Sequence, residues 1–218
     1  MKMKVLAFAA SVRRGSFNRK LIALAARIAR EEQSEVDLAD FRDFSMPIYD
    51  GDLEEEQGLP EGALELKQRV EWADALIIST PEYNFSIAGP LKNAFDWVSR
   101  ARPMPWRGKS VYLMSASPSP MGGIRGLWQT RIPFEGCGAL VFPDMFALPH
   151  ANTAFTKSGE LAESRMAERL HMELVGFLRL AEAVSRICGK AVPPRERTRR
   201  SQIAAALEEQ TAIQSGSA

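Results

Sequence analysis

Along most of its length the sequence alternates between short apolar runs and segments with the spacing of a helix. The first apolar run covers residues 5–10, and the segment after it repeats apolar residues at i, i+3, i+4 and i+7, as in a helix with one buried face: Leu21, Leu24, Ala25 and Ile28. The alternation occurs five times. Because crossovers between parallel strands are nearly always right-handed, it predicts an α/β fold with a doubly wound parallel sheet and helices on both faces.

The later elements follow the same rule. Further strands are predicted over residues 34–41, 75–80, 110–117 and 139–148. Pro143 is expected to interrupt the last of them, because proline cannot donate to a strand ladder. Further helices are predicted over residues 63–72, 90–98, 122–134 and 159–188. The acidic residues 51–62, which include Gly and Pro, are predicted to form a loop.

Length and composition indicate one ordinary globular domain. The chain has 218 residues, of which 45% are hydrophobic and 25% charged. We expect a domain over residues 1–189 and a separate tail over residues 190–218. Near its start the tail has two adjacent prolines among basic residues, in "GKAVPPRERTRR". Two interpretations stay open for it: a solvated terminus, or an arm that packs against another subunit.

Charge and residue content argue against several classes of protein. The 28 basic and 27 acidic residues nearly cancel, so no overall field draws the chain to nucleic acid or to an anionic membrane. The two cysteines lie far apart and there are only two histidines, so we expect no metal site. The apolar run near the N-terminus is too short for a signal peptide, and no segment has the roughly 18 apolar residues that span a bilayer. We therefore expect a cytoplasmic protein.

In a doubly wound sheet, ligands bind beyond the carboxyl ends of the strands, which directs attention to the loops there. The loop after the first strand offers donors at Ser11, Ser16 and Asn18, together with the charge of Arg13 and the positive end of the next helix. It lacks the spaced glycines of a dinucleotide site, so the pattern favours a terminal phosphate over a pyrophosphate. The alternative is an ordinary helix N-cap with surface arginines.

The loop after the third strand, "STPEYNFSIAGP", combines flat apolar groups with backbone donors. Pro81, Tyr83 and Phe85 alternate there with Glu82 and Asn84. This composition suits a planar heterocycle. The alternative is that the aromatic side chains fill the core, where such residues are common.

The loop after the fourth strand, "SASPSPMGG", ends in two glycines. Gly122 and Gly123 allow another group to approach the backbone closely where a helix begins. Taken alone, this loop could be only a turn. Because all three loops are predicted at one edge of the sheet, together they indicate a ligand site more strongly than any one of them does.

Two motifs resemble those of the NADPH-dependent FMN reductase family, which includes bacterial quinone, chromate and azo-dye reductases. The stretch "ASVRRGSFNRKL" resembles the family's GSxRxxSxN phosphate loop, and "TPEYNFSIAGPLKNAFDW" resembles its PEYN flavin loop and following helix. The resemblance covers about residues 3–187 and implies a flavodoxin-like, five-stranded sheet in the order 2-1-3-4-5. The sequence departs from the family at Ala10, Pro118 and Pro120, where the family usually has glycine.

The resemblance implies a set of FMN-binding residues. The phosphate would be held by the first loop, with the backbone N–H of Phe17 assisting: Ser11, Arg13, Ser16, Phe17 and Asn18. The isoalloxazine would lie against the second motif: Pro81, Glu82, Tyr83, Asn84 and Phe85. Its other edge would be approached by the loop after the fourth strand: Ser117, Gly122 and Gly123.

The implied activity passes hydride from NADPH or NADH to FMN and then to quinone, azo, chromate or free-flavin acceptors, in a homodimer or homotetramer. No Ser/His/Asp, Cys/His or paired-carboxylate constellation stands out in the sequence, and none is needed, because the flavin supplies the chemistry. We therefore predict no catalytic side chain. An alternative is a flavodoxin-type electron carrier, which the near-neutral charge disfavours because such carriers are typically acidic. Another is that FMN is a substrate that leaves in reduced form.

Overall fold

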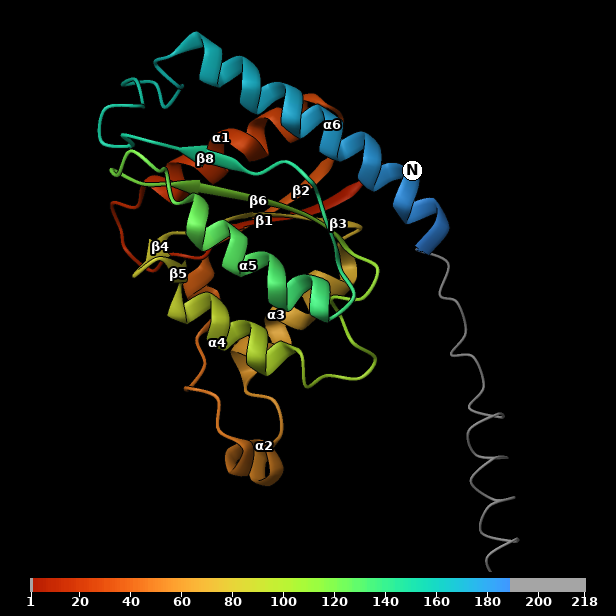
Figure 1. The fold of residues 1–218 in the computed structure, drawn as a ribbon. Coiled ribbons are helices and arrows are strands. Elements are labelled where there is room, and N and C mark those ends of the chain that lie inside the picture. Colours follow the sequence, from red (N-terminus) through yellow and green to blue (C-terminus); the bar gives the residue numbers. More distant parts are fainter. Residues whose placement is uncertain (1, 189–218) are drawn as a thin grey trace, which may run out of the picture.

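A twisted parallel sheet lies between two layers of helices in the computed structural model, which describes residues 2–188 (Figure 1). Four strands lie side by side in parallel: β2 (Glu35–Ala39), β1 (Lys4–Ala9), β3 (Ala75–Ser79) and β6 (Ser110–Ala116). This architecture confirms the predicted fold class. The tail expected over residues 190–218 lies outside the described residues.

The last position of the sheet is shared by two short strands. β7 (Leu140–Val141) pairs with the start of β6, and β8 (Phe146–Leu148) pairs with its end, both in parallel. Pro143 lies between them, as predicted for an interrupted strand. With β7 and β8 counted together, the order agrees with the expected 2-1-3-4-5.

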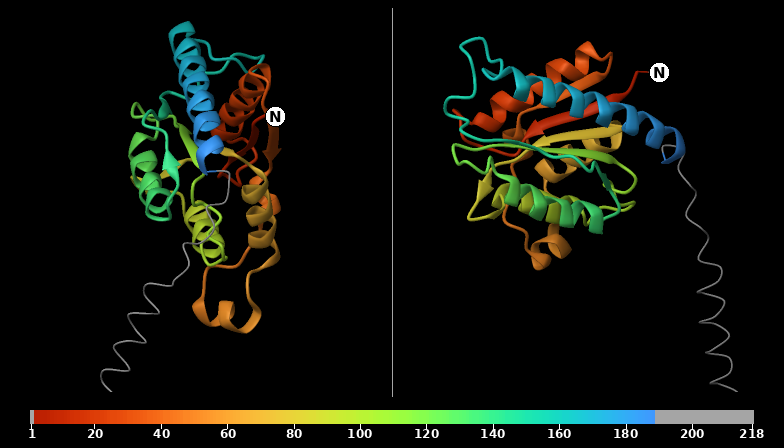
Figure 2. Two further views of the ribbon diagram at one scale, coloured as in Figure 1. Left: turned by 90° about the vertical axis from the view of Figure 1, so that its right-hand side faces the viewer. Right: turned by 45° about the horizontal axis from the view of Figure 1, so that its top comes forward.

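The helices divide between the two faces of the sheet, as both views in Figure 2 show. One face is covered by α1 (Phe17–Glu31) and α6 (Ser164–Cys188), and the other by α3 (Glu61–Trp72), α4 (Gly89–Val98) and α5 (Ile124–Gly136). Successive side chains of β1 alternate between the two cores: Val5 and Ala7 pack on the α1 side, Leu6 and Phe8 on the α3 side. Burial on both faces explains why this strand is an unbroken apolar run.

Several segments differ from the sequence-based prediction. The loop predicted over residues 51–62 is wrong, because α2 (Gly51–Gln57) lies there. This helix buries no residue, so it leaves no apolar period in the sequence, and it is capped by the Asp50 side chain, which accepts a hydrogen bond from the Asp52 N–H at 2.9 Å. The strand predicted over residues 34–41 ends at Ala39, and a short 3₁₀ helix, η1 (Phe41–Phe44), follows it.

Two helices begin later than predicted. α5 begins at Ile124 because Gly122 and Gly123 have φ angles of 62° and 89°, which a right-handed helix cannot include. α6 begins at Ser164 because Phe155 and Leu161 form an antiparallel bridge in the segment before it. Among the described residues, no helix is both long and apolar enough to cross a membrane, and no group of three or more His, Cys, Asp or Glu could hold a metal ion.

Candidate cofactor site

The carboxyl ends of three neighbouring strands bring the three candidate loops together. Ala9 of β1 pairs with Ser79 of β3, and Ser79 pairs with Met114 of β6. Two backbone hydrogen bonds continue this alignment into the loops, since the Ala10 N–H donates to the Ser79 carbonyl and the Thr80 N–H donates to the Met114 carbonyl, each at 2.8 Å. The sequence-based prediction that these loops share one edge of the sheet is confirmed.

Asn18 links the start of α1 to two of these strands. Its side-chain Oδ1 accepts hydrogen bonds from the Ser79 hydroxyl at 2.8 Å and from the Ala116 N–H at 2.9 Å, while its Nδ2 donates to the Ala116 carbonyl at 3.1 Å. The residue is buried in the first turn of α1. Its amide therefore joins the first loop to the ends of β3 and β6, a role that the spacing of residues in the sequence did not indicate.

Two serines with little exposed surface lie at the two ends of the first loop: Ser11 follows β1, and Ser16 precedes α1. Ser16 is the N-cap residue, yet its side chain makes no capping hydrogen bond. Ser11 is also buried, and within residues 2–188 neither hydroxyl has a hydrogen-bond partner. Phe17 is the first residue of the helix, where the backbone N–H has no intrahelical partner. These donors and the positive end of the helix form a suitable anion site.

Arginines lie on the first loop and on the two elements next to it, α1 and η1. Arg13 is exposed on the loop itself. Arg42, from η1, donates from Nε and Nη2 to the Val12 carbonyl at 3.2 and 3.0 Å, which fixes the loop from outside. Arg19 forms an ion pair with Asp40 at 2.7 Å. The backbone N–H of Arg42 and the Arg19 guanidinium lower the pKa of Asp40 below its usual value, although desolvation acts in the opposite sense.

The second motif forms a small hairpin instead of an open loop. β4 (Glu82–Tyr83) pairs with β5 (Ser86–Ile87) in antiparallel fashion, and Asn84 and Phe85 make the turn. The side chains of Tyr83 and Phe85 are 51% and 66% exposed, so the alternative in which they fill the core is wrong. Pro81 is half-buried where the chain leaves β3. Aromatic surface is thus presented at the carboxyl edge of the sheet.

The carboxylate of Glu82 points to α5. It accepts hydrogen bonds from Arg125 Nε at 2.9 Å and from the backbone N–H of Gly126 at 3.0 Å, and Arg125 Nη2 lies 2.7 Å from the same carboxylate. The Glu82 side chain is only 8% exposed. Its backbone remains at the predicted flavin edge, while its charge fastens the hairpin to the start of α5.

The loop after β6 approaches its neighbours too closely for side chains. A Cβ on Gly123 would lie 2.1 Å from the Ser115 hydroxyl oxygen, and one on Gly122 would lie 2.9 Å from backbone atoms at Ala147 and Leu148. Both glycines also have positive φ. Ser117 is half-buried at the end of β6, and its hydroxyl accepts a hydrogen bond from the Ser119 N–H at 3.2 Å. The glycines therefore let this loop pack directly against Ser115 and against the end of β8.

The three loops were predicted from the sequence, but two residues that contact the first loop and the helix after it were not. Arg42 contacts the Val12 carbonyl of the first loop from 30 residues further along, and Asp40 pairs with Arg19 of α1 across 21 residues. No local pattern in the sequence marks either residue. Their only signal is position, since β2 lies beside β1 and its carboxyl end must come close to the same edge.

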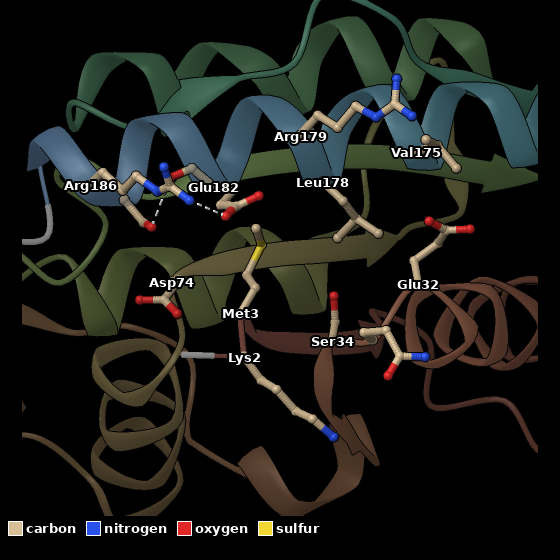
Figure 3. A pocket seen from close by; sticks show the side chains of 12 residues that line it. Lys2, Met3, Glu32, Ser34, Asp74, Val175, Leu178, Arg179, Glu182 and Arg186 are labelled. Atoms are coloured by element: carbon tan, nitrogen blue, oxygen red, sulfur yellow. Dashed lines mark hydrogen bonds and ion pairs between the residues drawn. The ribbon is translucent and has the colours of Figure 1, made fainter.

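A large open hollow lies at the opposite ends of the strands (Figure 3). It has a volume of about 870 Å³ and is lined by the residues just before β1, the turn between α1 and β2, and the C-terminal half of α6. Its charges balance: Lys2, Arg179 and Arg186 against Glu32, Asp74 and Glu182. Arg186 already pairs with Glu182 at 2.5 Å. We therefore place the candidate cofactor site at the carboxyl edge and not in this hollow.

Comparison with known proteins defines the class. The family model for NADPH-dependent FMN reductases matches residues 3–153. A quinone reductase of Escherichia coli (strain K12) is 32% identical over 81% of this chain and 94% of its own length. An NAD(P)H-dependent FMN reductase of Pseudomonas aeruginosa is 32% identical over 79% of this chain and 91% of its own. The structure is similar to FerB, a flavoenzyme NAD(P)H:(acceptor) oxidoreductase from Paracoccus denitrificans, with a TM-score of 0.70, 28% identity, and coverage of 83% and 98%.

This protein is a flavin-dependent oxidoreductase with a flavodoxin-like fold, as defined by its sheet, by the three loops at the carboxyl edge of that sheet, and by these similarities. The chain belongs to the NADPH-dependent FMN reductase family. Its cofactor is FMN, its reductant is NAD(P)H, and its acceptors are small molecules. The hydroxyls of Ser11 and Ser16, which have no hydrogen-bond partner within residues 2–188, and the free N–H groups at the start of α1 fit the phosphate of such a cofactor. An archaeal flavodoxin, at 8% identity and a TM-score of 0.55, shares the fold alone.

Proposed function

We propose that FMN binds across the carboxyl edge of the sheet, with its phosphate in the first loop. The observation that carries the proposal is the pair of serines at the two ends of the first loop: Ser11 follows β1, Ser16 is the N-cap residue of α1, and within residues 2–188 neither hydroxyl has a hydrogen-bond partner. Arg13 would balance the phosphate charge, and the Phe17 N–H would donate to it. Asn18 would act mainly by holding the loop to β3 and β6.

The isoalloxazine would lie between the hairpin and the loop after β6. Pro81, Tyr83 and Asn84 would line one edge, with backbone N–H groups of Tyr83 or Asn84 near its polar atoms. Ser117, Gly122 and Gly123 would approach the other edge. The chemistry that FMN supplies there is acceptance of hydride from NAD(P)H and delivery of two electrons to a second substrate.

Quinones are the acceptors that we propose. Relatives named for this chemistry support the choice, namely the Escherichia coli quinone reductase and a 2-hydroxy-1,4-benzoquinone reductase of Burkholderia that is 42% identical over 51% of this chain. In the balanced reaction, NAD(P)H and one proton reduce the quinone to a hydroquinone and leave NAD(P)⁺. The chain's residues bind and orient both substrates at an open face, and no side-chain nucleophile or metal takes part in the scheme.

The proposal includes a homodimer or homotetramer in the cytoplasm. Trp128 and Ile132 are 53% and 62% exposed, and their i, i+4 spacing places them on one face of α5. Such an apolar face suits contact with a second copy. The cytoplasm supplies the NAD(P)H that the reaction consumes. Light scattering at micromolar concentration tests the oligomer, and a monomer would contradict it.

The function is tested by loading the purified protein with FMN, dialysing it and recording the visible spectrum. Retained flavin absorbance identifies a cofactor, whereas its loss identifies FMN as a substrate. Stopped-flow mixing with NADPH and with NADH should bleach the flavin, and adding a quinone should restore the colour. Flavin that binds tightly but is not reduced by either nucleotide would reject the reductase and favour an electron carrier.

A further inference from the structure

The turn of the β4–β5 hairpin contains a residue that rarely adopts its backbone conformation. Asn84 and Phe85 have φ angles of 50° and 65°, and Tyr83 pairs with Ser86 on either side of them. A two-residue turn with both central residues at positive φ normally takes Asn or Asp first and Gly second. Asn84 obeys this preference. Phe85 does not, because a bulky side chain at positive φ is strained.

Burial in the core does not compensate for this strain. The Phe85 side chain is 66% exposed and belongs to neither core cluster. The contact that orients it comes from the guanidinium of Arg125, whose central carbon lies 4.3 Å from the ring centroid. A guanidinium at this distance stacks on one face of the ring. The exposed part of Phe85 is therefore the ring face opposite Arg125.

Arg125 is itself fixed, so the ring has a defined place. Its Nε and Nη2 both bind Glu82, whose carboxylate is nearly buried and also accepts the Gly126 N–H. A Cβ on Gly126 would lie 3.0 Å from the Glu82 Cβ and 3.1 Å from the Ser86 carbonyl oxygen, so the hairpin packs directly on α5. Strained backbone that the surroundings hold in place is typical of functional sites.

We propose that Phe85 is the stacking surface for the second substrate and that it favours flat aromatic acceptors over compact inorganic ones. This inference rests on the proposed function, since it assumes that the acceptor reaches a flavin at the same edge. One ring face is covered by Arg125, and the other is open to a planar quinone. An octahedral or tetrahedral anion cannot stack on it. Phe85 is thus a specificity-determining residue, and Glu82 and Arg125 are positioning residues.

The test compares Phe85→Gly with Phe85→Tyr in the FMN-loaded enzyme. Glycine suits positive φ, so the hairpin is retained while the ring is lost; tyrosine keeps the ring. With NAD(P)H saturating, we expect Phe85→Gly to raise the KM for a 1,4-naphthoquinone roughly three- to tenfold, as expected for one lost aromatic contact, with little change in kcat. The KM for ferricyanide, which cannot stack on the ring, should rise much less than the KM for the naphthoquinone. Phe85→Tyr should behave as the parent with both acceptors.

A second measurement, thermal unfolding, uses the flavin-free protein and does not depend on enzyme activity. Because glycine relieves the strain at this position, the Tm of flavin-free Phe85→Gly should equal or exceed that of the parent protein. A residue with a merely structural role would lower it. Ile48→Gly serves as the matched control, because Ile48 is also apolar, is 86% exposed, and lies on the segment between η1 and α2. Ile48→Gly should leave the KM values for the naphthoquinone and for ferricyanide unchanged.

Three results would overturn the inference. One is an equal change in KM for both acceptors in Phe85→Gly, and another is a clear fall in Tm. The third is a smaller assembly of Phe85→Gly in light scattering, which would assign the ring to contact with another copy. Failure of the proposed function looks different, because the parent itself would then show no reduction of bound flavin by NADPH or NADH.

Discussion

Asn18 and Ala116 exchange two hydrogen bonds across 98 positions of the sequence. The Asn18 Nδ2 donates to the Ala116 carbonyl at 3.1 Å, and the Ala116 N–H donates to Asn18 Oδ1 at 2.9 Å. The first turn of α1 is thereby locked to the end of β6, with the Ser79 hydroxyl of β3 as a third partner. The helix turn that follows the proposed phosphate loop is therefore tied to the buried framework, while residues 12–15 of the loop are exposed.

Asn18→Ala should destabilise the protein even without flavin. The substitution leaves the buried Ala116 N–H and the Ser79 hydroxyl without their acceptor, which costs about 2–4 kcal/mol of the free energy of unfolding. Urea unfolding of the flavin-free protein measures this loss. An unchanged unfolding midpoint would show that the link is dispensable.

Ser16→Ala should weaken FMN binding while leaving the free energy of unfolding almost unchanged. Because the Ser16 hydroxyl makes no capping hydrogen bond, its loss should change the free energy of unfolding by less than about 0.5 kcal/mol. FMN affinity should fall about tenfold, since one hydrogen bond to a charged phosphate is lost. Riboflavin, which has no phosphate, should bind Ser16→Ala and the parent equally. Unchanged FMN affinity would remove Ser16 from the phosphate site.

Arg42→Ala tests the outer support of the phosphate loop. Both of its hydrogen bonds go to the Val12 carbonyl, and the side chain is exposed, so we expect a modest loss of about three- to tenfold in FMN affinity. Fluorescence titration with FMN and with riboflavin measures it, and the effect should be confined to FMN. Arg30→Ala is the control, because Arg30 ends α1 at the opposite edge. Equal losses in both variants would show a general charge effect.

Gly126→Ala should displace the hairpin from α5. The new methyl group would meet Glu82 and the Ser86 carbonyl at 3.0–3.1 Å, so we expect weaker FMN binding and a loss of about 1–3 kcal/mol in stability. Gly136→Ala is a matched control at the end of the same helix, because no atom lies within 4 Å of the position that its new methyl group would take. It should be neutral or stabilising by up to about 1 kcal/mol. A similar loss in both variants would contradict the steric argument.

Tyr112→Phe should alter the alkaline stability profile. Burial first, and then the Glu173 carboxylate that accepts its hydroxyl at 2.6 Å, raise the pKa of Tyr112 well above 10. Above pH 10 the folded protein therefore keeps a proton that the unfolded chain releases. This contribution is complete below pH 10 and falls by up to about 1.4 kcal/mol per pH unit above it.

Urea unfolding at pH 8, 10 and 11 measures this effect. The stability difference between the parent and Tyr112→Phe should be constant from pH 8 to 10 and then shrink. A difference that stays constant to pH 11 would mean that the Tyr112 hydroxyl titrates normally.

The elements that were predicted correctly from the sequence are those whose apolar residues recur at a regular spacing. The buried face of α1 and the doubly buried β1 follow from spacing, because both elements contribute to a core on which the fold depends. α2 could not be found in this way, since it buries nothing. The first-loop motif located Ser11 and Ser16, but not Arg42, whose contact depends on the tertiary arrangement of β2 beside β1. Glu82 was expected at the flavin, and only the side-chain geometry shows that its charge is used by Arg125 and Gly126.

The division of the last strand at Pro143 also limits unwanted association. An exposed sheet edge is a template on which another chain can add a strand, and long, flat edges are the most dangerous. Here that edge consists of two residues in β7 and three in β8, separated by a proline that cannot donate a hydrogen bond. The protein can thus present exposed aromatic side chains at its hairpin while offering almost no continuous backbone on which aggregates could grow from this side of the sheet.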